Sequence, residues 1–181
     1  MIPSKLLTSL LCLAFLLVWD VALPMEEKDS ANPQESCLRF VQSFYDWYAT
    51  NALGKKGIIA SDYALEHKSQ VFSPELLRAL KQDADAQAKA RGVIVGIDFD
   101  PFVGSQDPAE KYKVGVIRQK DDRYLVEVYG IYDGSPNQTP DVRAELVQTS
   151  GTWVLVNFYY PPVSGNLLDV LRLLRDDRQK H

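Results

Sequence analysis

Apolar residues recur at intervals of three and four positions from Pro33 to Asn51, which is the spacing of one face of an α-helix. The repeat predicts a first helix with a strongly aromatic face, on which Trp47 is expected to be buried. The members of the repeat are Leu38, Phe40, Val41, Phe44, Tyr45, Trp47 and Tyr48.

A second helix is predicted to begin at Ser73-Pro74. Serine is a favoured N-cap residue, and proline is tolerated at the first helical position because its missing N–H would have no partner there. The helical pattern continues to Arg91, and Gly92 is a suitable residue to end it. Residues 53–70 show no sustained period, so this segment is expected to be irregular apart from a short helical turn around 63–68.

The second half of the chain alternates apolar and polar residues with a period of two, which is typical of β-strands. The short links Asp121-Asp122 and Ser150-Gly151 indicate antiparallel hairpins. The last strand is apolar on both sides and is therefore expected to be central in the sheet and covered by a helix, with Trp153 buried. The four predicted strands are Tyr112–Val116, Tyr124–Tyr129, Val142–Leu146 and Trp153–Tyr160.

Asn166 can cap a final short helix whose leucines at 167, 171 and 174 share one face. The order is then helices, an antiparallel meander and a terminal helix. Helices followed by a run of strands indicate an α+β fold.

The N-terminus has the architecture of a signal peptide, because Lys5 precedes the apolar run Leu6–Trp19 and Asp20 ends it. We assign residues 1–24 to the signal peptide, residues 25–36 to a polar leader and residues 37–181 to one α+β domain. Asp20 would lie three residues before a cut after Ala22, where a small residue is preferred, so the cleavage site is not fixed. An uncleaved N-terminal anchor is the alternative to export into the periplasm or the medium.

The composition narrows the classes of partner. Twenty basic residues against 24 acidic ones give a net charge of −4, without the basic surface that nucleic-acid backbones require. Cys37 would be the single thiol left after removal of the signal peptide, so no disulfide could form within the mature chain. We expect Cys37 to be a small buried core residue.

Four short motifs occur in order along the chain: Phe44–Tyr48, Ser73–Leu77, Asp98–Phe102 with Gln106-Asp107, and Trp153–Pro161. Together they resemble a family of exported bacterial proteins known as a domain of unknown function, with a fold of the nuclear-transport-factor-2-like (cystatin-like) group. The resemblance covers roughly residues 37–174. It implies a curved antiparallel sheet wrapped around helices, with a conical pocket, and it brings no activity.

The candidate binding residues are three aspartates, Asp98, Asp100 and Asp107, and two tyrosines of the first helix, Tyr45 and Tyr48. The aspartates could form turns, face a pocket or bind a hard cation. However, they lack the further acidic ligand and the glycine of a calcium loop, so no metal is expected. The tyrosines could belong to the core or line a pocket.

No catalytic residue can be named, because the sequence contains no glycine-rich phosphate loop, nucleophile elbow or paired-cysteine metal motif. We therefore expect a non-catalytic domain of the cell envelope that binds a small molecule or a protein partner and needs no cofactor. The expected sites are the concave space between the first helix and the sheet, and the open face of the sheet. The alternative is a small pocket enzyme of the isomerase or dehydratase type that uses an aspartate and a tyrosine.

Overall fold

The first helix, α1 (Pro33–Asn51), has the predicted bounds in a computed structural model that describes residues 32–163 and 165–180. The side chain of Asn32 caps it by accepting a hydrogen bond from the backbone N–H of Gln34 at 3.1 Å. The helix thus begins inside the segment 25–36 that was expected to be a polar leader. The expected signal peptide, its cleavage site and the rest of the leader lie outside the described residues.

The other helices follow the sequence pattern closely. The Ser73 hydroxyl accepts from the N–H of Leu76, as predicted for an N-cap, and the Asn166 side chain does the same for Asp169. The predicted turn around 63–68 is a two-turn helix that begins slightly earlier. The elements are α2 (Ala60–His67), the 3₁₀ segment η1 (Ser69–Val71), α3 (Pro74–Lys89) and α4 (Leu167–Arg178).

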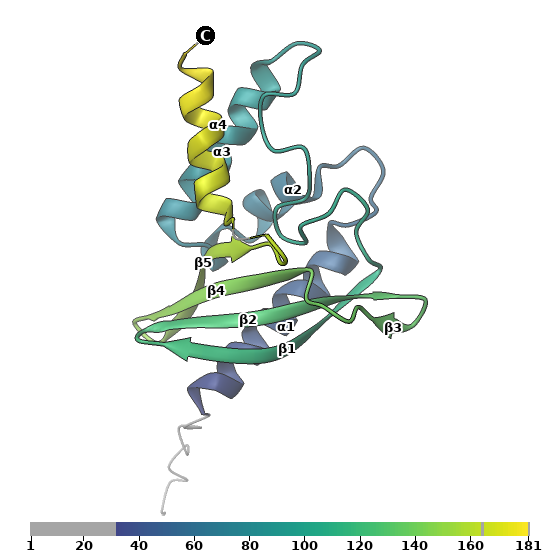
Figure 1. Ribbon diagram of the computed structural model, residues 1–181, viewed down its shortest axis with the longest axis vertical. Helices are drawn as coiled ribbons and strands as arrows, with labels where there is room; N and C mark the ends of the chain where they lie inside the picture. Colours follow the sequence, from purple (N-terminus) through teal and green to yellow (C-terminus); the bar gives the residue numbers. More distant parts are fainter. Residues whose placement is uncertain (1–31, 164, 181) are drawn as a thin grey trace, which may run out of the picture. The chain divides into compact units, whose positions relative to one another are not determined.

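The strands form one curved, open antiparallel sheet in the order β1-β2-β4-β5, and the very short β3 pairs with β2. Figure 1 shows α1 crossing this sheet and α3 lying beside α4. The α+β architecture predicted from the sequence is therefore confirmed. The strands are β1 (Lys111–Lys120), β2 (Arg123–Tyr132), β3 (Ser135–Pro136), β4 (Val142–Thr149) and β5 (Thr152–Tyr159).

The expectation that the last strand is central is wrong, because β5 is an edge of the sheet. Its free side is partly covered by the segment before α3: Phe72 forms a parallel bridge with Leu155, and the Ser73 N–H donates to the Leu155 carbonyl at 2.8 Å. Both α3 and α4 also contact β5. The other half of the expectation, that a helix covers this strand, is confirmed by these contacts.

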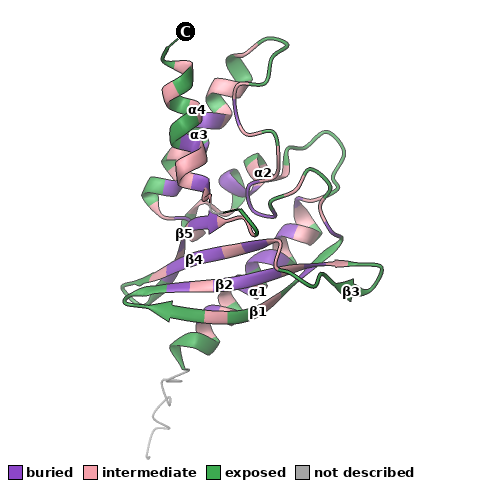
Figure 2. Cartoon of the chain, in the orientation of Figure 1, coloured by how far each residue is buried: buried purple, intermediate pink, exposed green. Residues whose placement is uncertain are grey.

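Aromatic rings fill the space between α1 and the sheet. Phe44 packs against Phe72 and Phe102 with ring centroids 5.8 Å away in each case, and Phe102 also contacts Phe158 at 5.3 Å. These rings are at most 4% exposed, and the buried residues of the sheet are visible in Figure 2. The concave space in which a ligand was expected is thus occupied by the core.

The two tryptophans discussed above differ in burial. Trp153 is 6% exposed, packs edge-on against Tyr124 and donates its indole N–H to the Ser36 hydroxyl at 3.0 Å. Trp47 is only partly buried and stacks on Tyr63, with a ring-centroid distance of 6.0 Å. The prediction of burial is confirmed for Trp153 and wrong for Trp47, because the side of α1 that carries Trp47 packs on α2 near the surface and not on the sheet.

The face of the sheet opposite the core carries an unusual buried carboxylate. Glu127 is 4% exposed and accepts hydrogen bonds from Arg118 at 2.6 Å, Tyr129 at 2.8 Å and Arg143 at 3.2 Å. Burial by itself would raise the pKa of Glu127, but these donors hold it below its ordinary value. Charged groups therefore cover this face instead of an apolar layer.

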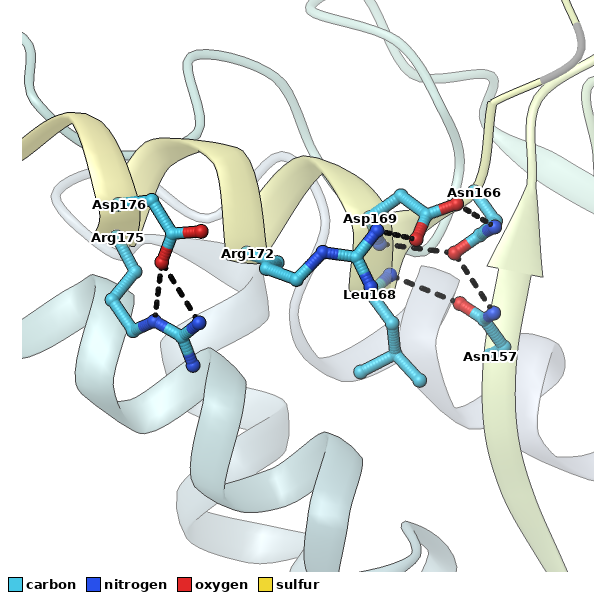
Figure 3. A network of polar contacts seen from close by, with 7 residues as sticks. All are labelled: Asn157, Asn166, Leu168, Asp169, Arg172, Arg175 and Asp176. Atoms are coloured by element: carbon cyan, nitrogen blue, oxygen red, sulfur yellow. Dashed lines mark hydrogen bonds and ion pairs between the residues drawn. The ribbon is translucent and has the colours of Figure 1, made fainter.

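A polar network anchors the start of α4 to β5 (Figure 3). The Asn157 side chain accepts from the backbone N–H of Leu168 at 3.1 Å and donates to Asn166 at 3.0 Å. Asn166 in turn donates to Asp169 at 2.6 Å, and Arg172 donates to the other oxygen of that carboxylate at 2.7 Å. The first-turn N–H groups of α4 thus have side-chain partners, which fixes the direction of the helix.

Two further expectations can be compared with the described residues. Cys37 is fully buried, as expected, and burial raises the pKa of its thiol to about 12. None of the helices in residues 32–180 combines the length and the apolar character that crossing a bilayer requires.

Candidate functional site

An open cleft of about 750 Å³ lies between α2, α3 and the long connection that leads from α3 to β1. The end of α1 and the following loop close it on one side through Ala52, Leu53 and Gly54. The cleft has the size of a typical small-molecule site, for which about 300–1,000 Å³ is common. It is separate from the aromatic core between α1 and the sheet.

The α3 side of the cleft is fixed by contacts to the connection. Asp83 is buried and accepts from the Ile97 N–H at 2.8 Å and from Arg178 of α4 at 2.6 Å. Arg178 also donates to the Val95 carbonyl at 2.7 Å, and the Gln87 side chain accepts from the Val95 N–H at 2.9 Å. Two helices therefore hold residues 95–97 in place, and with them Ile97, which lines the cleft.

Two tyrosines of α1 hold the next part of the connection from the core side. The Tyr45 hydroxyl donates to the Phe102 carbonyl at 2.6 Å, and the Tyr48 hydroxyl donates to the Asp100 carboxylate at 2.6 Å. The second oxygen of Asp100 accepts from the backbone N–H of Phe102 at 2.9 Å. We call these contacts the tyrosine latch. They position Asp100 at the cleft, and Tyr160 of the sheet edge adds a further hydrogen bond to the same turn.

Burial dominates the electrostatics of the latch. It raises the pKa of Asp100 above its ordinary value, although the hydrogen bonds from Tyr48 and the Phe102 N–H work in the opposite direction. The pKa values of Tyr48 and Tyr45 are also raised, first by burial and then by the nearby negative charge of Asp100 and by neighbouring tyrosines. Both hydroxyls therefore stay neutral and act as hydrogen-bond donors.

The lining of the cleft is apolar and acidic. Its titratable side chains are four aspartates, and none of the lining residues in the described chain is Lys, Arg or His. Partial burial raises the pKa of Asp62 of α2, whose side chain remains exposed, and burial raises that of Asp100. The four aspartates are Asp62, Asp83, Asp98 and Asp100.

The residues predicted from the sequence fall into three groups. Asp98 and Asp100 line the cleft. Tyr45 and Tyr48 are fully buried in the core and support the cleft from behind through the latch. Asp107 is exposed and is not among the lining residues; its backbone exchanges hydrogen bonds with the Ser105 side chain in a turn.

Sequence reasoning missed the lining residues on α2, on α3 and in the loop after α1. A signal was present in Ile58 and Ile59, an apolar pair in a glycine-containing loop, and in Ile94 after α3. These side chains are 41%, 65% and 72% exposed, and all three line the cleft. Large apolar side chains left in solvent around a concavity indicate a recognition surface.

The described residues offer no obvious metal centre, since no group of three or more His, Cys, Asp or Glu side chains in this part of the chain is arranged to hold an ion. What the cleft provides is an apolar surface with carboxylates at fixed positions.

Comparison with known proteins adds information on the fold only. No protein-family model matches the chain, and no curated protein matches it. One solved structure is similar: a protein of unknown function from Bacteroides thetaiotaomicron VPI-5482, with a TM-score of 0.50 and 17% sequence identity. The match covers 72% of this chain and 94% of the other. The chain therefore shares its α+β fold with a bacterial protein whose function is unknown.

Proposed function

We propose that the protein is an exported, non-catalytic module that binds a small molecule in the cleft between α2, α3 and the α3–β1 connection. The observation that carries the proposal is the cleft itself, with a volume of about 750 Å³ and apolar walls. Its walls are held by hydrogen bonds from α1, α3 and α4. A preformed site of this kind does not require the ligand to pay for ordering the protein.

A small molecule fits the geometry better than a protein partner. Protein interfaces usually extend over a broad surface, whereas the exposed isoleucines here surround a concavity. The open face of the sheet is a weaker candidate because it is covered by the charged network around Glu127.

Export and the fold family are parts of the same proposal. The charged start and apolar run of residues 1–24 support export, and the order of helices followed by a curved meander supports a nuclear-transport-factor-2-like fold. To test export, residues 1–30 can be fused to a reporter that is active only outside the cytoplasm. An inactive reporter at normal expression would contradict this part of the proposal.

The binding function can be tested with the purified protein by screening metabolites and envelope extracts for thermal stabilisation. Each stabilising compound is then followed by mass spectrometry for conversion. Ala88→Trp introduces a bulky ring on the exposed cleft side of α3, and Gln82→Trp serves as the control on another side of this helix. Stabilisation without conversion that is lost only in Ala88→Trp supports the proposal, whereas unchanged binding by Ala88→Trp contradicts it.

The second candidate is an enzyme, and the Asp100–Tyr48 pair is the observation that favours it. A buried carboxylate with a raised pKa beside a tyrosine donor is the arrangement expected for an acid–base pocket enzyme. However, Tyr48 already donates its hydroxyl hydrogen to Asp100, and its side chain is fully buried behind that carboxylate. The pair is therefore better suited to holding the loop than to reacting with a substrate. A product whose formation disappears in Asp100→Asn, with folding intact, would establish the enzyme instead.

A further inference from the structure

One side of the cleft is held firmly by α3. The Gln87 side chain accepts from the Gly96 N–H at 3.0 Å and donates to the first carbonyl of residues 93–97 at 3.1 Å. Gly96 also lies so close to the helix that a Cβ atom there would be 2.7 Å from an oxygen of the Asp83 carboxylate. We call residues 93–97 the fixed wall. Ile94, which lines the cleft, is carried on this wall.

The opposite side includes a loop, residues 54–59, that has no such attachment. All six residues are exposed. Across the described ranges, the loop makes two backbone hydrogen bonds, one inside it from Ile58 to Lys55 and one that Tyr63 of α2 donates to its last carbonyl. The Lys55 ammonium also lies over the Tyr63 ring, 5.4 Å from the ring centroid. These contacts are all local in sequence, and full exposure with few tertiary contacts is characteristic of a segment that moves.

The loop has the backbone freedom that such a movement requires. Gly54 and Gly57 have φ angles of +67° and +77°, a region that glycine enters without steric cost. A Cβ atom at either position would meet no atom within 4 Å, so these glycines serve the backbone and not close packing. Residues of this kind can absorb the φ/ψ change of a hinge.

Exposed isoleucines line the cleft from both sides. Ile58 and Ile59 belong to the loop, and Ile94 belongs to the fixed wall. Movement of the loop across the mouth of the cleft would take these side chains out of water together, which is favourable. The side that can move and the side that cannot therefore carry matching apolar surfaces.

We propose that residues 54–59 form a flap that closes over an occupied cleft, with Ile58 and Ile59 moving towards Ile94 on the fixed wall. The inference rests on the proposed binding function and describes how that site retains its ligand. Without a ligand, closure over a cleft of about 750 Å³ would leave the apolar lining without partner atoms. The flap is therefore open in the free protein and closes on a ligand with an apolar body.

The movement can be followed by pulsed electron paramagnetic resonance on the full chain, with the neutral apolar fluorophore N-phenyl-1-naphthylamine as the probe ligand. Spin labels are attached at Ser43→Cys on α1 and at either Lys56→Cys on the flap or Val93→Cys on the fixed wall, all exposed positions outside the lining. Every variant carries Cys12→Ser so that labelling is confined to the chosen positions, and Cys37 is fully buried. Saturating probe should shift the Ser43–Lys56 distances and leave the Ser43–Val93 distances unchanged.

The isoleucines are tested with Ile59→Ser and Ile94→Ser. The matched controls, Lys56→Ser and Val93→Ser, place the same residue at exposed positions of the flap and the fixed wall that do not line the cleft. In stopped-flow fluorescence, each isoleucine variant should release the probe about three- to tenfold faster, as expected when one aliphatic side chain is partly buried by closure. The association rate should change less, and both controls should behave as the native chain does.

The outcomes separate the flap from the binding function. If the probe binds the native chain and is excluded by Ala88→Trp, but the Ser43–Lys56 distances do not change, the flap is wrong while the binding function stands. The same conclusion follows if Ile59→Ser and Ile94→Ser release the probe at the native rate. If the probe does not bind saturably, or binds Ala88→Trp as well as the native chain, both the flap and the assignment of this cleft as the binding site fail.

Discussion

The tyrosine latch gives the sharpest test of how the cleft is held. Tyr48→Phe removes one hydroxyl and leaves the ring in the core, so its effect isolates the hydrogen bond to Asp100. Hydrogen bonds to charged groups contribute about 1.5–3 kcal/mol, and we expect the free energy of unfolding to fall by that amount near neutral pH. For a domain of this size the melting temperature should fall by roughly 4–10 °C.

The matched control is Tyr132→Phe, which also removes a single hydroxyl hydrogen bond. That bond is exposed and 3.3 Å long, so its loss should change stability by no more than about 0.5 kcal/mol. Urea denaturation followed by circular dichroism measures both variants, and hydrogen exchange reports on the amides of Phe102 and Gly104, which the latched turn protects. Equal losses of stability in Tyr48→Phe and Tyr132→Phe, or unchanged exchange at these amides, would refute the latch.

Three further predictions concern the tryptophans, the titration of Asp100 and calcium. Trp153→Ala should cost about 3–5 kcal/mol because it empties a buried site, whereas Trp47→Ala should cost less than about 2 kcal/mol because its ring is partly exposed; equal denaturation midpoints would contradict this difference. Burial raises the folded-state pKa of Asp100, so the folded chain favours the protonated carboxyl. Its contribution to the free energy of unfolding is fully present below the ordinary pKa of 3.8 and is lost as the pH rises through the folded-state pKa. In urea titrations over that pH range, the native chain should therefore lose stability relative to Asp100→Asn. A difference in unfolding free energy that stays constant with pH would contradict the raised pKa of Asp100. Millimolar calcium should leave the melting temperature unchanged, since the acidic residues of the connection lack a calcium loop; a rise of several degrees would overturn this prediction.

Much of the fold could be predicted because local signals and tertiary packing agree. The caps at Ser73 and Asn166, the aromatic period of α1 and the alternation of the strands all led to the observed elements. The predictions for the position of β5, the burial of Trp47 and a ligand space between α1 and the sheet were wrong, because each depends on how distant elements pack. An apolar pattern shows that a strand is covered on both faces, but it does not show whether the strand lies at the centre or at the edge of the sheet.

The site was less accessible to sequence reasoning because its walls come from four separate segments of the chain. Asp98 and Asp100 attracted attention as an acidic cluster, and both line the cleft; their binding role remains a prediction. The role of Tyr48 depends on a contact between residues 52 positions apart, which no local pattern encodes. The sequence shows Ile58 and Ile59 as an apolar pair, but it does not show that they line the same cleft as residues of α3.

The buried carboxylate on the outer face of the sheet restricts the order in which this surface can change during evolution. While Glu127 is present, loss of Arg118 or Arg143 leaves a desolvated negative charge with too few donors. If position 127 first becomes neutral, both arginines are released from this role and can vary with little effect on folding. Lineages that reshape this face are therefore expected to replace the glutamate before the arginines, and a library of double variants would show this as strong dependence of the arginine positions on position 127.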